Sequence, residues 1–135
     1  MMGLTDGSKI LIVDDEIVIA DTLATIFSIH GQAVRAAYSA EQAIELLEMW
    51  QPALAILDVV LPNMNGIDLA IFIKENYPGC QVLLFSGQII TTALAEDAAM
   101  KGHDFEILAK PVLVPDLLDK AARLLAPSVE NQVPS

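Results

Sequence analysis

The chain is poor in cysteine and in basic residues, and each shortage narrows the class of protein to which it can belong. Among 135 residues there is one cysteine, so no internal disulfide can form and a reducing compartment is expected. Lysine and arginine together number seven against 18 acidic residues, which gives a net charge of −11. Because such a chain repels phosphate backbones and anionic lipid, we expect neither nucleic-acid nor membrane binding.

Long apolar runs are also missing. The longest apolar stretch, residues 17–29, is too short to span a bilayer and contains Asp21. The first nine residues, MMGLTDGSK, have no apolar segment behind a basic start, so we expect no secretion signal and a cytoplasmic location. Hydrophobic residues nevertheless make up 54% of the chain, enough for a sizeable core without disulfides or metals.

Five short apolar runs alternate with segments of helical pattern. The predicted strands are residues 9–13, 33–37, 53–57, 81–85 and 105–109. The predicted helices are residues 16–30, 39–51, 66–76, 91–101 and 115–125. This alternation with short connections predicts an α/β fold, a doubly wound five-stranded parallel sheet. We expect a single domain over residues 1–135, with its core at about 8–126 and with flexible termini.

Charged and polar residues follow the carboxyl ends of these strands, where open α/β sheets bind ligands. They are Asp14, Asp15 and Glu16, then Asp58, then Ser86, and finally Lys110. Carboxylates a few ångströms apart repel each other, which either raises their pKa values or demands a cation. Oxygen ligands at a partly open site suit Mg²⁺. Beside a metal and a lysine, one carboxylate can attack phosphorus and form an aspartyl phosphate. Taken singly, each residue also has an ordinary role, such as helix capping by the first three.

Four segments resemble, in order and spacing, the receiver domains of bacterial two-component response regulators. They are ILIVDDE, LDVVLPNMNGIDL, LLFSG and AKPV, and the resemblance covers about residues 8–126. It implies a flavodoxin-like (CheY-like) fold with strand order 2-1-3-4-5. It also implies a phospho-accepting signalling switch that is not an enzyme. The implied partners are a sensor histidine kinase or phosphotransfer protein and a downstream protein target.

The resemblance assigns a phosphoacceptor and a metal site. It implies that Asp58 takes the phosphoryl group. It implies that Mg²⁺ is bound directly by Asp15, Asp58 and the backbone carbonyl of Val60, and by Asp14 largely through water.

The resemblance also assigns a switch and shows one departure from it. Lys110 is implied to contact the phosphoryl group, Ser86 to move onto it, and Pro111 to follow a cis peptide bond. The family commonly has an aromatic switch residue three positions before the lysine, and Ile107 stands there instead. The interval from Gly102 to Lys110 is also one residue longer than usual. These departures bear on the switching step and not on phosphorylation.

Other functions stay open on the sequence. A small phosphatase of the haloacid dehalogenase type also uses an aspartate nucleophile, although that class has Asp-x-Asp after its first strand. A degenerate receiver acts only as a binding module, and a flavodoxin-like protein binds a flavin cofactor. Because only ten residues follow Leu125, we expect a stand-alone receiver that is a monomer or weak dimer. Excision from a longer hybrid kinase or transcription factor is the alternative.

Overall fold

The computed structural model describes residues 7–86, 102, 105–110 and 113–126. Its elements in chain order are β1 (Lys9–Val13), α1 (Ile17–Ile29), β2 (Ala33–Ala37), α2 (Ala40–Met49), β3 (Leu54–Asp58), α3 (Gly66–Asn76), β4 (Gln81–Ser86), β5 (Glu106–Ala109) and α5 (Val114–Leu125). All strand pairs are parallel, in the order β2-β1-β3-β4-β5. Both the predicted doubly wound sheet and its implied strand order are confirmed.

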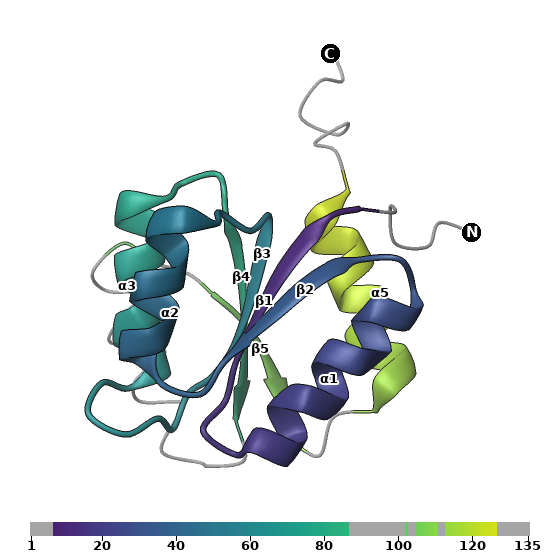
Figure 1. Ribbon diagram of the computed structural model, residues 1–135, viewed down its shortest axis with the longest axis horizontal. Coiled ribbons are helices and arrows are strands. Elements are labelled where there is room, and N and C mark those ends of the chain that lie inside the picture. The colour runs from purple at the N-terminus through teal and green to yellow at the C-terminus, as the bar shows by residue number, and fades with distance from the viewer. Residues whose placement is uncertain (1–6, 87–101, 103–104, 111–112, 127–135) are drawn as a thin grey trace.

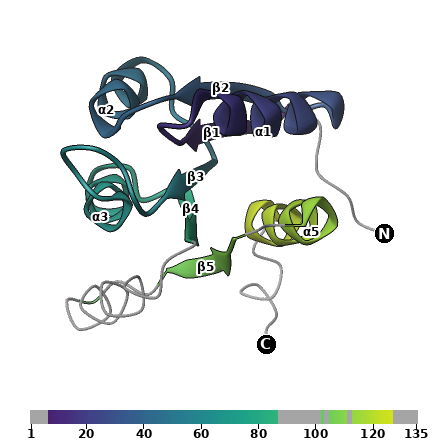
Figure 2. The same ribbon diagram turned by 90° about the horizontal axis from the view of Figure 1, so that it is seen from below.

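Helices cover both faces of the sheet. Figure 2 shows α2 and α3 on one face and α1 and α5 on the other. The inner strand β1, between β2 and β3, is buried on both sides, with Leu11 and Val13 in the core beneath α2 and α3 and with Ile10 and Ile12 in the core beneath α1 and α5. This two-sided burial explains why residues 10–13 form a continuous apolar run instead of alternating with polar residues. No helix in the described ranges is long and apolar enough to cross a membrane.

The predicted boundaries differ from the observed ones mainly at the sheet's carboxyl edge. β1 and β2 match the prediction, whereas β3 both begins and ends one residue later than predicted and β4 runs one residue further. Asp58 pairs with Phe85 and Ser86 with Ala109, so both polar residues end their strands instead of following them. β5 begins one residue later than predicted, and α5 begins at Val114, one residue before the predicted start.

Two helix starts follow the sequence signals closely. The Ser39 hydroxyl caps α2 by accepting a hydrogen bond from the Gln42 backbone N–H at 3.1 Å. Gln42 in turn accepts one from the Tyr38 N–H at 2.8 Å, which completes a variant of a capping box. α3 occupies residues 66–76 as predicted. The predicted helix at 91–101 and both termini lie outside the described residues.

Cys80 lies buried just before β4 and gives a testable property. Its Sγ donates a hydrogen bond to the Gln81 carbonyl, and burial raises the pKa of the thiol to about 12. Because the thiolate is the reactive form, we expect a maleimide at pH 8 to leave the native protein unlabelled. Intact mass should show full labelling only after denaturant is added. Native labelling at the rate of a free thiol would contradict this burial.

Candidate functional site

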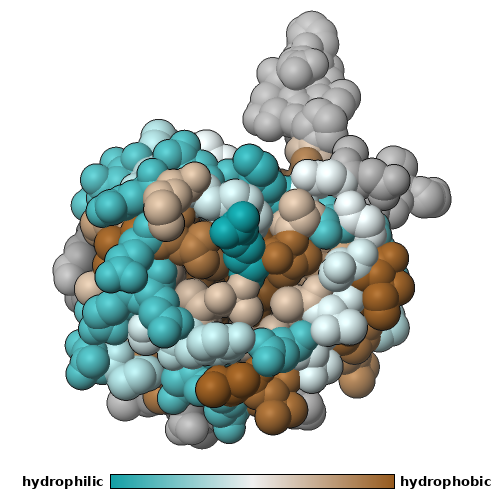
Figure 3. Space-filling model, in the orientation of Figure 1, coloured by the Kyte–Doolittle hydropathy of each residue, from teal (hydrophilic) through white to brown (hydrophobic). Residues whose placement is uncertain are grey.

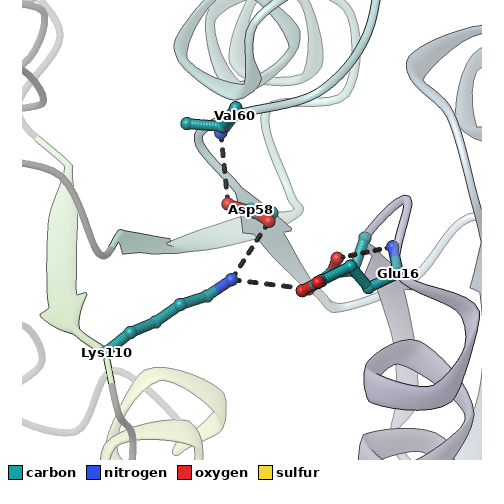
Figure 4. Close-up of polar contacts among 5 residues, drawn as sticks. Glu16, Asp58, Val60 and Lys110 are labelled. Atoms are coloured by element: carbon teal, nitrogen blue, oxygen red, sulfur yellow. Dashed lines mark hydrogen bonds and ion pairs between the residues drawn. The ribbon is translucent and has the colours of Figure 1, made fainter.

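Three strands deliver their acidic and basic side chains to one point at the carboxyl edge of the sheet. Asp14 and Asp15 follow β1, Asp58 ends β3, and Lys110 follows β5. The Lys110 backbone N–H donates to the Ser86 carbonyl at 2.8 Å, so the chain after β5 stays paired with the end of β4. Figure 4 shows the Lys110 side chain reaching toward Asp58 across this edge.

The Lys110 ammonium bridges two carboxylates. Its Nζ lies 3.1 Å from Asp58 Oδ2, in a hydrogen bond, and 3.7 Å from Asp14 Oδ2. Partial burial lowers the pKa of this lysine, but the hydrogen bond and charge of Asp58, helped by Asp14, outweigh it and leave the pKa raised. The side chain is therefore a permanent cation at neutral pH, held beside the carboxylates at the edge of the sheet.

Asp14 is the most buried acid of the cluster. Its Oδ1 accepts a hydrogen bond at 2.9 Å from the backbone N–H of Glu16, the N-cap residue of α1, whose own side chain makes no capping hydrogen bond. Its Oδ2 is buried and has no hydrogen-bond donor among the described residues. Burial first, and then the negative charge of Asp58, raise the pKa of Asp14 to about 6. An oxygen held in this way fits a cation better than it fits a structural role.

The cluster meets the requirements of a magnesium site. Carboxylate oxygens of Asp14, Asp15 and Asp58 lie within 4.8 Å of one another. The first and third residues are buried and Asp15 is exposed, so the group is fixed on one side and open to solvent on the other. Mg²⁺ takes oxygen ligands and keeps several waters, which such a half-open set of carboxylates allows.

The loop after Asp58 is held tightly against the sheet. The Val60 backbone N–H donates to Asp58 Oδ1 at 3.1 Å and orients the carboxylate, while the Val60 side chain is 52% exposed. The Gly66 N–H donates to the Val59 carbonyl at 2.7 Å. A Cβ on Gly66 would overlap the Asp58 carbonyl oxygen and lie 2.9 Å from the Val59 Cα. In the sequence, turn chemistry alone accounts for this glycine, and nothing there indicates its contact with the Asp58 backbone.

The remaining predicted residues lie around this centre. Ser86 is buried at the end of β4. Ile107 pairs with Leu84 and packs, half-buried, against the core beneath α2 and α3, so an aliphatic side chain occupies the position of the switch aromatic. Pro111 and its implied cis bond lie outside the described residues. The roles of Ser86 and Ile107 in switching stay predictions.

Comparison with known proteins decides the family. Residues 10–122 match the family described as the response regulator receiver domain. The chain belongs to this family. A solved receiver domain from Clostridium thermocellum has a TM-score of 0.78 and 29% identity, covering 87% of this chain and 94% of that one.

Two curated relatives show how the receiver is used elsewhere. The regulator of RpoS from Escherichia coli K12 is 34% identical over 106 residues, which are 78% of this chain and 31% of that protein. The probable transcriptional regulatory protein TcrX of Mycobacterium tuberculosis is 27% identical over 126 residues, 92% of this chain and 53% of that protein. The receiver therefore spans about half or less of these relatives. Its family supports a phospho-accepting role in two-component signalling.

Proposed function

We propose that this receiver accepts a phosphoryl group on the Asp58 carboxylate from a sensor histidine kinase or phosphotransfer protein, and that the change alters its contact with a downstream protein. The observation that carries the proposal is the position of the Lys110 ammonium, which lies between the carboxylates of Asp58 and Asp14. A structural ion pair needs one carboxylate. A cation held between two, beside a buried oxygen without a donor, is arranged for a ligand that brings both negative charge and a metal.

Transfer then needs positioning more than covalent chemistry. The Val60 N–H holds one Asp58 oxygen and Lys110 the other, so the carboxylate is oriented before the donor arrives. A carboxylate oxygen bonds to phosphorus as the phosphorus–nitrogen bond of the donor's phosphohistidine breaks, and the electron pair returns to the imidazole. Lys110 is placed to follow the new negative charge from the carboxylate to the phosphoryl oxygens.

We assign the Mg²⁺ to Asp14, Asp15, Asp58 and the backbone carbonyl of Val60. When bound, Mg²⁺ supplies the charge neutralisation that lets anionic donor and carboxylate approach each other. The contribution of the chain is to keep Asp14 buried with one oxygen that accepts no hydrogen bond and has only the Lys110 ammonium nearby, because the Glu16 N–H satisfies only the other oxygen. Asp15 is exposed and would hold the ion from the side that is open to solvent.

The test is phosphorylation by a small donor. We expect acetyl phosphate with Mg²⁺ to add one phosphoryl group to the wild type by intact mass, and EDTA to prevent it. Asp58→Asn should show no adduct, whereas Asp119→Asn, an exposed acid on α5, should behave as the wild type. If Asp58 is not the nucleophile of a phosphatase, turnover of p-nitrophenyl phosphate should be the same for the wild type and Asp58→Asn. A folded wild type without any adduct would contradict the proposal and indicate a receiver that only binds.

A further inference from the structure

The outer strand β2 leaves part of its backbone unpaired. Figure 1 shows β2 at the edge of the sheet, in front of β1. The Ala33 N–H donates to the Ser8 carbonyl and the Ala37 carbonyl accepts from the Asp14 N–H, so the odd-numbered residues face β1. Alternate residues of a strand point their backbone groups to opposite sides. The N–H and C=O groups of Val34 and Ala36 therefore face outward, and no described residue bonds them.

Both ends of this open edge are closed. The next outward N–H after Ala36 belongs to Tyr38 and donates to the Gln42 side chain at 2.8 Å. Before the strand, the Gln32 N–H donates to the Phe27 carbonyl at 3.1 Å. The open edge thus offers four backbone groups, two donors and two acceptors, over a single short stretch.

A hollow lies beside this edge on its α1 side. It measures about 310 Å³ and is lined by Ala24, Thr25, Ser28, Ile29 and Val34. The Thr25 hydroxyl already donates to the Asp21 carbonyl within α1, so this donor needs no hydrogen-bond acceptor from a ligand. Ile29 is 76% exposed at its rim. Such a hollow fits aliphatic side chains that point to the same face as Val34.

The α2 side of the edge carries residue types that dominate binding energies. The Arg35 guanidinium lies 5.1 Å from the centre of the Trp50 ring, and Met49 beside it is 82% exposed. Tryptophan, arginine and methionine are enriched at protein interfaces. Figure 3 looks onto this side of the molecule and shows apolar residues gathered between α1 and α2.

The charges around the edge select a basic occupant. α2 packs beside β2 and exposes three acids, Glu41, Glu45 and Glu48. Arg35 is the single cation of the edge strand, and its charge is already over the Trp50 ring. The whole chain carries −11, so a positively charged segment is attracted to this face.

We propose that the β2 edge docks an extended peptide segment of a partner protein as an additional antiparallel strand. Two aliphatic side chains enter the α1 hollow, an aromatic one lies beside Arg35 and Trp50, and basic residues flank this core. Main-chain hydrogen bonds to Val34 and Ala36 supply affinity, and the alternate side chains supply specificity. This surface is separate from the phosphoacceptor site, so it stands or falls without the proposed function.

A second copy of the chain is a poor occupant. Two-fold pairing that uses all four open groups sets Val34 against Ala36 of the other copy. It then sets Arg35 directly opposite Arg35, and like charges directly opposed across strands are destabilising. It also joins two chains of −11 each.

The probe for the test is the peptide acetyl-Lys-Leu-Tyr-Leu-Lys-amide, added to ¹⁵N-labelled protein without Mg²⁺ or phosphodonor. We expect NMR shift changes at the amides of Val34, Ala36 and Ile29. N-methylation of both leucines removes the pairing donors and should weaken binding about tenfold. Replacing both lysines of the peptide with glutamate should weaken it similarly.

Protein variants locate the site. Ser28→Trp fills the hollow from an exposed position and should weaken binding, whereas Ser28→Ala should leave it unchanged. Asp58→Asn should bind the peptide as the wild type does, which separates this surface from the phosphoacceptor. The absence of binding, shifts centred elsewhere, or equal binding of the N-methylated peptide would overturn the proposal. So would dimerisation through β2 in sedimentation, which would make a second copy the occupant.

Discussion

Replacing Gly66 with alanine is expected to slow phosphorylation of Asp58 on the order of a hundredfold, because a displacement of about 1 Å at a reacting group has that effect. The added Cβ meets the Asp58 carbonyl oxygen and the Val59 Cα, which are backbone atoms that cannot rotate away. Either α3 moves outward or β3, which ends at Asp58, shifts. The adduct formed with acetyl phosphate and Mg²⁺, followed over time by intact mass, measures the effect.

The same overlap should lower the free energy of unfolding by about 1–3 kcal/mol, as overpacking in a tight site does. Gly79→Ala is the matched control, because nothing lies within 4 Å of a Cβ at that position. We expect it to keep both the rate and the stability of the wild type. If Gly66→Ala is phosphorylated at the wild-type rate, the loop after Asp58 adapts freely to the added Cβ, contrary to the geometry.

The contrast between Asp58 and Gly66 shows how far the sequence alone reaches. Parallel strands deliver the residues after them to one edge, so the meeting of Asp14, Asp58 and Lys110 could be predicted from strand order and spacing. The contact of Gly66 with the Asp58 carbonyl could not, because it depends on how closely α3 packs against β3. A glycine at the first position of a helix was the only signal, and turn chemistry explains it equally well.

Register and side-chain direction limited the other predictions. Asp58 and Ser86 end their strands because each has a cross-strand partner, and the pairing is not visible in an apolar run. The Asp14 oxygen without a donor depends on the Glu16 N–H taking the other oxygen. The open edge of β2 was hidden for a different reason, since the sequence AVRAA also fits a helix.

Asp14→Asn is expected to stabilise the metal-free protein at pH 7. The pKa of Asp14 is about 6 in the folded protein against an ordinary 3.8. Between these values the folded chain holds a proton that the unfolded chain has lost, so the wild type loses stability as the pH rises from about 4 to 6. The difference in pKa corresponds to about 3 kcal/mol of unfolding free energy. The folded chain has this contribution in full below pH 3.8 and has lost it above pH 6.

An asparagine carries no charge to desolvate, and its amide oxygen still accepts from the Glu16 N–H. The variant should therefore match the wild type near pH 4 and exceed it by about 2–3 kcal/mol at pH 7 in EDTA, measured by urea unfolding. Asp119→Asn, an exposed acid paired with Arg123, should follow the wild type at both pH values.

Magnesium should reverse this order. Ions that bind only the folded chain stabilise it by mass action, and the ionised Asp14 is a predicted ligand. Added Mg²⁺ should raise the unfolding free energy of the wild type at pH 7 and raise that of Asp14→Asn much less. An Asp14→Asn protein that is less stable than the wild type in EDTA at pH 7 would mean that Lys110 compensates the buried charge. Asp14 would then be a structural ion-pair partner of Lys110, and its buried charge would not destabilise the metal-free protein.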